Sequence, residues 1–135
     1  MATTSTIVYL GDLRTQMRHE RSGETVITDA PLDNNGKGEA FSPTDLVATG
    51  LGSCMLTMMG IKARDLGIDL GSVEVKVEKI MASDPRRISK IVVELRMPNS
   101  LDPNTCKILE NTARTCPVAK SLHPDIDQEM IFFWP

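Results

Sequence analysis

The stretch Ser42-Pro43-Thr44-Asp45, together with the apolar run from Leu46 to Leu56 that follows it, decides the fold of this 135-residue chain. The four residues supply an N-cap hydroxyl, a proline at the first helical position and an acid three residues after the cap. The run that follows carries almost no charge before Lys62. This pattern predicts a helix that continues to about Gly67 and is buried nearly all round in its first half.

Three glycines lie inside this expected helix, at Gly50, Gly52 and Gly60. Each glycine weakens a helix by roughly 1 kcal/mol relative to alanine. A buried helix that keeps three of them needs the close approach of another backbone. The apolar character of the helix is also more than a small single subunit covers easily, which predicts an obligate dimer.

Shorter segments with a two-residue period flank the helix on both sides. The expected strands are 6–10, 13–20, 24–28, 73–78, 91–97 and 130–134, and further helices are expected at 102–114 and from Cys116 to about Pro124. Strands do not alternate singly with helices, which disfavours a doubly wound parallel sheet. The order predicts one α+β domain over residues 1–135, with a mostly antiparallel sheet wrapped around the long buried helix.

Composition excludes several classes of protein. The net charge of −3 provides no basic field for nucleic acid. No apolar run reaches the roughly 18 residues that a membrane span needs, and the first residues lack the pattern of a signal peptide. We therefore expect a cytoplasmic protein without nucleic-acid or membrane partners, in which thiols are kept reduced and any disulfide is transient.

Two of the three cysteines stand in informative places. Cys54 lies within the apolar helix, and Cys116 directly precedes Pro117 at the start of a second helix. Backbone N–H groups at a helix start favour a thiolate, which points to thiol chemistry at Cys116. Cys54 taken alone is interpreted by default as a small buried apolar residue. Cys106 matches no motif and is interpreted as structural.

Both cysteine segments resemble the two signatures of the OsmC/Ohr family, the osmotically inducible and organic hydroperoxide resistance proteins. The first resemblance is carried by Ser42-Pro43-Thr44-Asp45-Leu46 and Gly52-Ser53-Cys54, and the second by Cys116-Pro117-Val118-Ala119-Lys120. The order of elements matches over nearly the whole chain, and residues 28–31 and 38–43 are most similar to the OsmC-like branch. The resemblance implies an intertwined homodimer with each active site at the subunit interface.

The resemblance further implies a stress-response peroxidase that reduces organic hydroperoxides or hydrogen peroxide. Cys54 would be the peroxidatic thiol and Cys116 the resolving thiol, and an external dithiol would restore both without metal, haem or flavin. The family also activates the thiol with an arginine from an N-terminal hairpin. Arg21 best matches that arginine by position, and Arg18 is the second candidate.

One departure from the family pattern concerns the residue after the helix-start proline. The better-known enzymes carry a glutamate there, paired with the activating arginine, whereas this chain has Thr44 and places its acid one residue later at Asp45. One residue turns about 100° around a helix, so Asp45 does not substitute for that glutamate. We therefore expect a less well held arginine and weaker peroxidase activity.

Other interpretations remain open at this point. A non-catalytic redox sensor or a small-ligand binding protein could use the same dimeric scaffold. A zinc site would need three or four converging ligands, and the two histidines, His19 and His123, show no ligand spacing with the cysteines. The glycine-rich loop 33–38 is either a surface connection or a lid.

Overall fold

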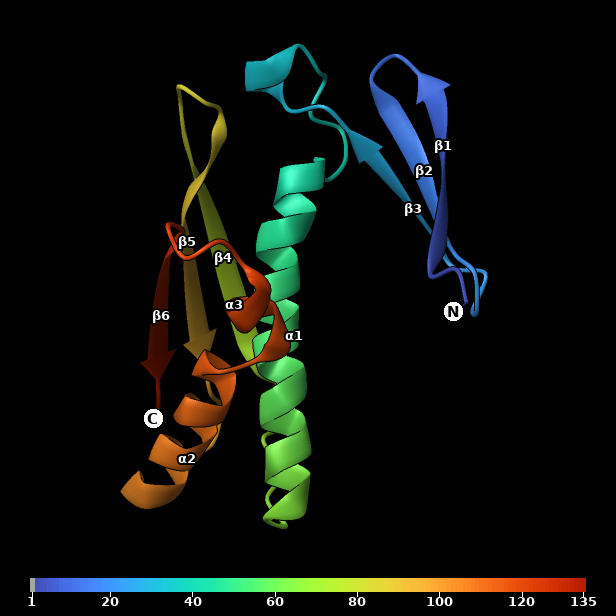
Figure 1. Ribbon diagram of the computed structural model, residues 1–135. Coiled ribbons are helices and arrows are strands. Elements are labelled where there is room, and N and C mark those ends of the chain that lie inside the picture. The colour runs from blue at the N-terminus through green and yellow to red at the C-terminus, as the bar shows by residue number, and fades with distance from the viewer. Residues whose placement is uncertain (1) are drawn as a thin grey trace. The chain divides into compact units, whose positions relative to one another are not determined.

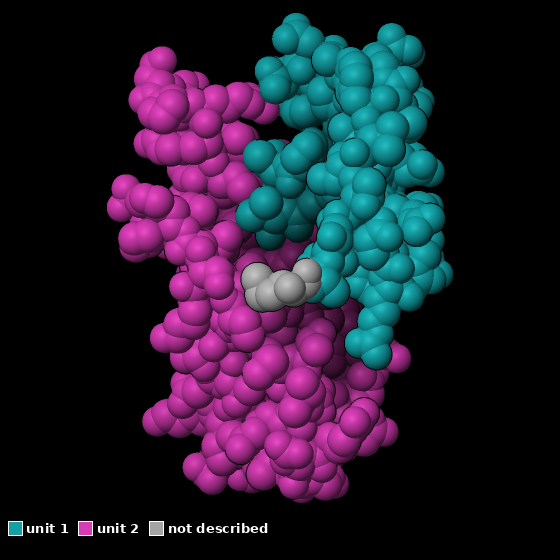
Figure 2. All heavy atoms as spheres, turned by 45° about the vertical axis from the view of Figure 1, so that its right-hand side comes forward, with its two compact units in different colours: residues 1–47 teal, residues 48–135 magenta. Residues whose placement is uncertain are grey.

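The computed structural model describes residues 2–135, which form two three-stranded sheets, three α-helices and one short 3-10 helix (Figure 1). The chain divides into two compact units, residues 1–47 and residues 48–135, which Figure 2 distinguishes by colour. In chain order the elements are β1 (Ser5–Gly11), β2 (Arg14–His19), β3 (Thr25–Asp29), η1 (Leu32–Asn34), α1 (Pro43–Asp65), β4 (Glu74–Ala82), β5 (Arg87–Arg96), α2 (Pro103–Arg114), α3 (Pro117–Ser121) and β6 (Asp127–Phe133). The α+β class expected from the sequence is confirmed.

The first unit is built on an antiparallel sheet in the order β1-β2-β3. Asp12 and Leu13 form the turn between β1 and β2 with φ of 54° and 64°. Two consecutive residues with positive φ are typical of a tight hairpin turn that matches the twist of its strands.

Both faces of this small sheet expose apolar side chains. Ile7, Val8, Tyr9 and Leu10 are consecutive on β1 and are 60%, 54%, 64% and 53% exposed. Because successive strand residues point to opposite faces, neither face of β1 is covered in a single chain. An exposed apolar surface of this kind marks an interaction site.

The second unit packs one face of a β4-β5-β6 sheet against helices (Figure 1). Its core is formed by side chains with no measurable exposure from α1, β5 and α2: Leu51, Met55, Met59, Ile91, Val93, Leu95 and Leu109. β6 runs parallel to β5, whereas the other strand pairs are antiparallel. The connection through α2 and α3 returns the chain to the starting end of β5, which makes this one parallel pair possible.

The expectation that the first half of α1 is buried nearly all round is wrong for the single chain. One side packs into the core, whereas Val47 is 41% exposed and Ser53 is also exposed in this half of the helix. A Cβ added at Gly52 would lie 2.9 Å from a methyl group of Val77. Gly52 therefore does allow a close approach, but of a side chain rather than of the expected backbone. Cβ atoms at Gly50 and Gly60 would meet nothing within 4 Å.

The expectation that the chain has no segment able to span a membrane also needs correction. By length and composition alone, α1 is long and apolar enough to cross a bilayer. The core helix of a soluble protein passes the same test, and α1 contributes Leu51, Met55 and Met59 to the core of the second unit. That packing explains the apolar residues on the side of α1 that faces the core.

Candidate functional site

Two candidate sets of functional side chains emerge, one in each compact unit. The thiol pair consists of Cys54 on α1 and Cys116 at the start of α3, both in the second unit. The Arg14 cluster consists of Arg14, Asp29 and Glu39 in the first unit. Each set is described by itself.

Cys116 is held by the cap of α3. It is the N-cap residue, Pro117 follows at the first helical position, and the Cys116 Sγ accepts a hydrogen bond from the backbone N–H of Ala119 at 3.5 Å. The side chain has no measurable exposure. The sequence expectation of a cysteine at a helix start is therefore confirmed in its geometry.

The electrostatic consequence differs from the expectation that the helix start favours a thiolate. Burial raises the pKa of the Cys116 thiol above its ordinary value of 9.0, and this outweighs the lowering of the pKa by the Ala119 N–H. A hydrogen bond with Cys54 raises the pKa further. The two sulfurs therefore lie close enough together for Cys54 to influence the pKa of the Cys116 thiol.

This contact brings together the two cysteines that the sequence singled out. Cys54 is half-buried and Cys116 is buried, and both are free thiols. Cys106 has a different environment, because its thiol donates to the Leu101 carbonyl oxygen at 3.6 Å and burial raises its pKa. Its interpretation as structural stays a prediction.

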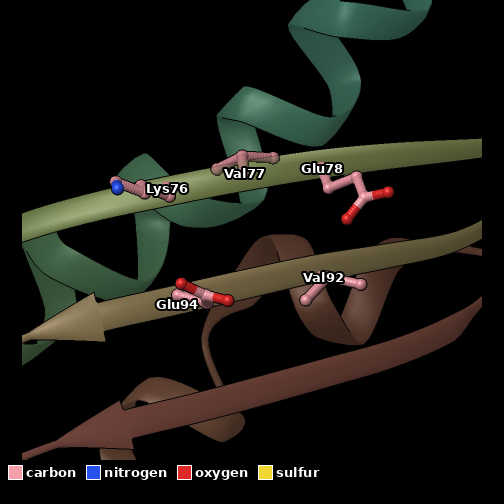
Figure 3. A pocket seen from close by; sticks show the side chains of 5 residues that line it. All are labelled: Lys76, Val77, Glu78, Val92 and Glu94. Atoms are coloured by element: carbon pink, nitrogen blue, oxygen red, sulfur yellow. The ribbon is translucent and has the colours of Figure 1, made fainter.

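Two hollows lie near the second sheet. One, of about 400 Å³, runs between α1 and β4 and is lined by Thr49, Gly52, Ser53, Leu56, Thr57, Val75 and Val77, so it adjoins the helical turn that carries Cys54. The other, of about 190 Å³, lies over β4 and β5, where Lys76 and Glu94 face each other in register (Figure 3). The second hollow contains no thiol, and its charges are typical of a solvated strand surface.

The Arg14 cluster joins β2, β3 and the loop before α1. The Arg14 Nη2 lies 3.4 Å from Asp29 Oδ2 and 3.0 Å from Glu39 Oε2. Arg14 and Asp29 are directly opposite each other in the β2–β3 register, which places both side chains on one face. The two carboxylates raise the pKa of Arg14, with the hydrogen bond to Glu39 contributing most.

Asp29 is the buried member of this cluster. It has no measurable exposure, and its Oδ2 also accepts a hydrogen bond from the Glu39 backbone N–H at 3.0 Å. That N–H lowers the pKa of Asp29 below its ordinary 3.8, and Arg14 lowers it further against the opposing effect of burial. The Oδ1 atom is buried without a hydrogen-bond partner among residues 2–135.

The arginines named from the sequence lie elsewhere in the first unit. Arg18 is exposed on β2 and pairs with Glu20 at 3.3 Å, and Arg21 is exposed in the turn between β2 and β3. Sequence reasoning missed Arg14. The signal that could have found it is the hairpin register, which sets Arg14 opposite an aspartate that ends β3.

The helix start itself forms as predicted. The Ser42 N–H donates to Asp45 Oδ2, and the Asp45 N–H donates to Ser42 Oγ, both at 3.0 Å. This reciprocal pair is a capping box, which confirms Asp45 as a capping residue. Thr44 lies within hydrogen-bond distance of Ser42 through its hydroxyl, at 3.2 Å. Among the described residues there is no group of three or more His, Cys, Asp or Glu side chains placed to hold a metal ion.

Comparison with known proteins identifies the family. The model of the OsmC-like protein family matches residues 36–130. The chain belongs to this family. A crystal structure from Psychrobacter arcticus 273-4, provisionally named an osmotic stress induced and detoxification response protein, is 57% identical, with a TM-score of 0.95 over 98% of this chain and 96% of that one.

More distant OsmC relatives share the fold. An organic hydroperoxide resistance protein OsmC from Legionella pneumophila is 17% identical, with a TM-score of 0.76 over 98% of each chain. The organic hydroperoxide resistance protein OhrB of Bacillus subtilis is also 17% identical, with a TM-score of 0.70 over 96% of this chain and 98% of that one. No curated protein sequence matches the chain.

Proposed function

We propose that this protein is a thiol-dependent peroxidase that reduces organic hydroperoxides or hydrogen peroxide with Cys54 and Cys116. The observation that carries the proposal is the contact between these two thiols, which come from distant parts of the chain. Membership of the OsmC family and the hydroperoxide resistance proteins among its structural relatives support it. The cytoplasm, where dithiol reductants keep cysteines reduced, is the proposed location.

The proposed reaction proceeds in three balanced steps. The Cys54 thiolate attacks one peroxide oxygen, an S–O bond forms as the O–O bond breaks, and the leaving alkoxide takes a proton to become an alcohol or, from hydrogen peroxide, water. The Cys116 sulfur, on loss of its proton, then attacks the Cys54 sulfenic acid, and water leaves as the disulfide forms. An external dithiol reduces the disulfide and is itself oxidised.

The acidity of Cys116 and the exposure of Cys54 assign the two roles. Burial is the largest cause that raises the pKa of the Cys116 thiol, so Cys116 is poorly suited to be the attacking thiolate. Cys116, with its raised pKa, remains protonated until the sulfenic acid has formed. Cys54 is also the less buried of the two, which suits the thiol that must meet the peroxide.

A cationic group is needed to lower the barrier for thiolate attack. The family resemblance assigns it to an arginine of the N-terminal hairpin, for which the sequence offers Arg21 and Arg18. Arg14 is a third candidate, supported by its partial burial and its fixed carboxylate partners. Alanine variants at the three positions distinguish them, because only the loss of the activating arginine should slow alkylation of Cys54.

We further propose that the working form is a homodimer. The apolar side chains exposed on both faces of the β1-β2-β3 sheet and the open side of α1 support this. Obligate interfaces usually bury upwards of roughly 2,000 Å², enough to cover surfaces of this extent. Light scattering at micromolar concentration should give twice the chain mass of 14.8 kDa. A stable monomer would contradict the dimer.

The competing function is a non-catalytic redox sensor or small-ligand binding protein. Steady-state peroxide consumption with an external dithiol distinguishes a peroxidase from a sensor or binding protein. The assay compares cumene hydroperoxide with hydrogen peroxide. Wild-type protein should turn over repeatedly and Cys54→Ser should not. If wild-type protein with reduced Cys54 consumes neither peroxide under any dithiol, the sensor or binding function replaces the peroxidase.

A further inference from the structure

We propose that Gln128 is a positioning residue for the thiol of Cys116. Its side chain anchors the carbonyl group of Ala119 and so holds α3, together with the sulfur at the start of that helix, against the second sheet. The inference rests on the proposed peroxidase function, in which Cys116 resolves the oxidised Cys54, and it assigns a role to a residue outside both cysteine motifs. All the contacts that carry it lie within residues 48–135.

Gln128 is a polar residue at the head of an apolar row. It is the second residue of β6, and the side chains that follow it at two-residue steps, Met130 and Phe132, pack against the core. Successive strand residues point to opposite faces, so Gln128 points to the same face as these two. Its register partner on β5 is Ile91, which has no measurable exposure. An amide at the border of a core is costly unless it is hydrogen-bonded, so the partner of Gln128 decides what this residue does.

That partner is a backbone carbonyl of α3. The Gln128 Nε2 donates to the Ala119 carbonyl oxygen at 3.1 Å. A carbonyl oxygen only accepts, which fixes the amide with its NH2 group toward α3. The Leu122 N–H is used by the Val118 carbonyl, and Leu122 is extended, with ψ of 151°, so no further helical turn supplies a donor for Ala119. Gln128 therefore satisfies a carbonyl that the end of the helix leaves open.

The same residue of α3 also holds the sulfur. The Ala119 N–H donates to Cys116 Sγ at 3.5 Å, so this residue is bonded to the sheet through its carbonyl and to the thiol through its N–H. α3 has only five residues, and helices shorter than about 12 residues are marginal without outside contacts. Its apolar contacts, from Val118, Ala119 and Leu122, bury surface without fixing a direction. The Gln128 hydrogen bond supplies a directional contact between α3 and the sheet.

The consequence concerns the step in which the disulfide forms. Cys116 is part of the core against which Cys54 packs, and the two sulfurs lie close enough to influence each other. A disulfide requires its two sulfurs to reach a specific geometry, and reacting groups that are held near that geometry have a high effective concentration. By limiting the movement of α3, Gln128 raises the effective concentration of Cys116 at Cys54. It acts through Ala119 rather than on either sulfur.

The first test measures this effective concentration at equilibrium and without peroxide. Reduced protein is equilibrated with mixtures of oxidised and reduced dithiothreitol. The thiols of Cys54 and Cys116 give up two electrons and two protons as their disulfide forms, and oxidised dithiothreitol takes them up as it becomes the dithiol. Acid quenching, alkylation and peptide mapping give the bridged fraction.

Gln128→Met is the decisive variant, because methionine keeps an unbranched side chain of similar length and has no N–H donor. We expect the effective concentration to fall about tenfold, which for this two-electron couple is a shift of about 30 mV in reduction potential. A wild-type value in Gln128→Met would overturn the inference. So would wild-type protein that forms no disulfide between Cys54 and Cys116 at any ratio of the two forms of dithiothreitol.

Ser121→Ala is the matched control. The Ser121 hydroxyl donates to the Pro117 carbonyl oxygen at 2.8 Å, so this bond lies within α3 and does not tie the helix to β6. Its loss should leave the effective concentration within about twofold of wild type, and so should Gln128→Lys, which keeps a donor on a flexible stem. A tenfold fall in either variant would show that the anchor is not the cause and would overturn the inference. If Gln128→Met does not fold, Gln128→Glu replaces it, since an ionised carboxylate only accepts.

A kinetic measurement separates this inference from the peroxidase proposal. One equivalent of cumene hydroperoxide is added together with dimedone, which traps the Cys54 sulfenic acid in competition with Cys116. Gln128→Met should form cumyl alcohol at the wild-type rate but give about tenfold more trapped Cys54 relative to disulfide. Equal slowing of both steps would indicate a general structural defect and would overturn the positioning role. If wild-type protein forms no alcohol, the peroxidase proposal fails, whereas the dithiothreitol equilibrium still decides the role of Gln128.

Discussion

The buried thiol of Cys116 lies close enough to Cys54 for Cys54 to raise its pKa, so the fold brings the N-terminal turn of α3 to the middle of α1 at these two sulfurs. Nothing in the local sequence of either segment requires Cys54 and Cys116 to lie close together. It results from the packing of α1 and of the segment around α3 in one core, with Leu51 and Met55 on α1 and Val118 and Leu122 on the other side.

The first prediction concerns the disulfide. Treatment of the reduced protein with one equivalent of peroxide should link Cys54 to Cys116 within one subunit, because Cys54 already lies close enough to influence the pKa of the Cys116 thiol. Peptide mapping under non-reducing conditions identifies the bridge, and Cys106 should remain alkylatable. A bridge to Cys106, or linkage only between subunits, would refute the pairing.

The second prediction follows from the raised pKa of Cys116. In the reduced protein, Cys116 should react with iodoacetamide only well above pH 9, its ordinary pKa, and Cys54→Ser should lower that midpoint because one of its causes is removed. Since the native pKa exceeds the unfolded one, the native state binds more protons there, and the stability contributed by this thiol is lost as pH rises above 9. Cys116→Ser should therefore show a smaller decline of stability between pH 8 and pH 10.5. A midpoint below 9 would contradict the burial argument.

The third prediction tests the open side of α1. In a single chain Gly60 faces open space, so Gly60→Leu should raise stability by about 1 kcal/mol through helix propensity. If a second copy packs against this side, the same change should instead dissociate the dimer in light scattering. Asn111→Leu on the exposed side of α2 is the control that changes surface apolarity alone. A Gly60→Leu dimer of unchanged size would place the interface elsewhere.

The fourth prediction uses the departure at Thr44. If the missing carboxylate leaves the activating arginine less well held, restoring the family glutamate as Thr44→Glu should raise peroxide turnover about tenfold, as better placement of a catalytic group does. The comparison is made under identical dithiol and cumene hydroperoxide concentrations. Turnover within about twofold of wild type would show that the missing carboxylate does not limit the reaction.

Local signals in the sequence were enough for most of the fold. The proline-marked starts of α1, α2 and α3 lie where Pro43, Pro103 and Pro117 predict them, and the period-two segments became strands. The parallel pairing of β5 with β6 was not predictable, because strand direction depends on the path of the intervening helices. The uncovered side of α1 was also missed, since an apolar sequence does not distinguish burial in one chain from burial between two.

The candidate site was likewise predictable from the sequence only in part. Cys54 and Cys116 were named from their motifs, and the fold brings them into contact. Arg14 was not named, because its importance comes from its cross-strand partner Asp29 and its loop partner Glu39, neither of which is near it in sequence. Long-range pairing of this kind becomes visible only once strand register is known.

Two-thiol peroxide reduction is tested most directly by the stoichiometry of a single turnover. Fully reduced protein is mixed with one equivalent of cumene hydroperoxide per subunit without reductant, so that the sulfenic acid is not oxidised further, and the cumyl alcohol formed and the thiols lost are counted together. A two-thiol peroxidase should give one alcohol and two thiols lost per wild-type subunit, one alcohol and one thiol lost in Cys116→Ser, and neither in Cys54→Ser. Wild-type protein that keeps all its thiols and forms no alcohol would contradict it.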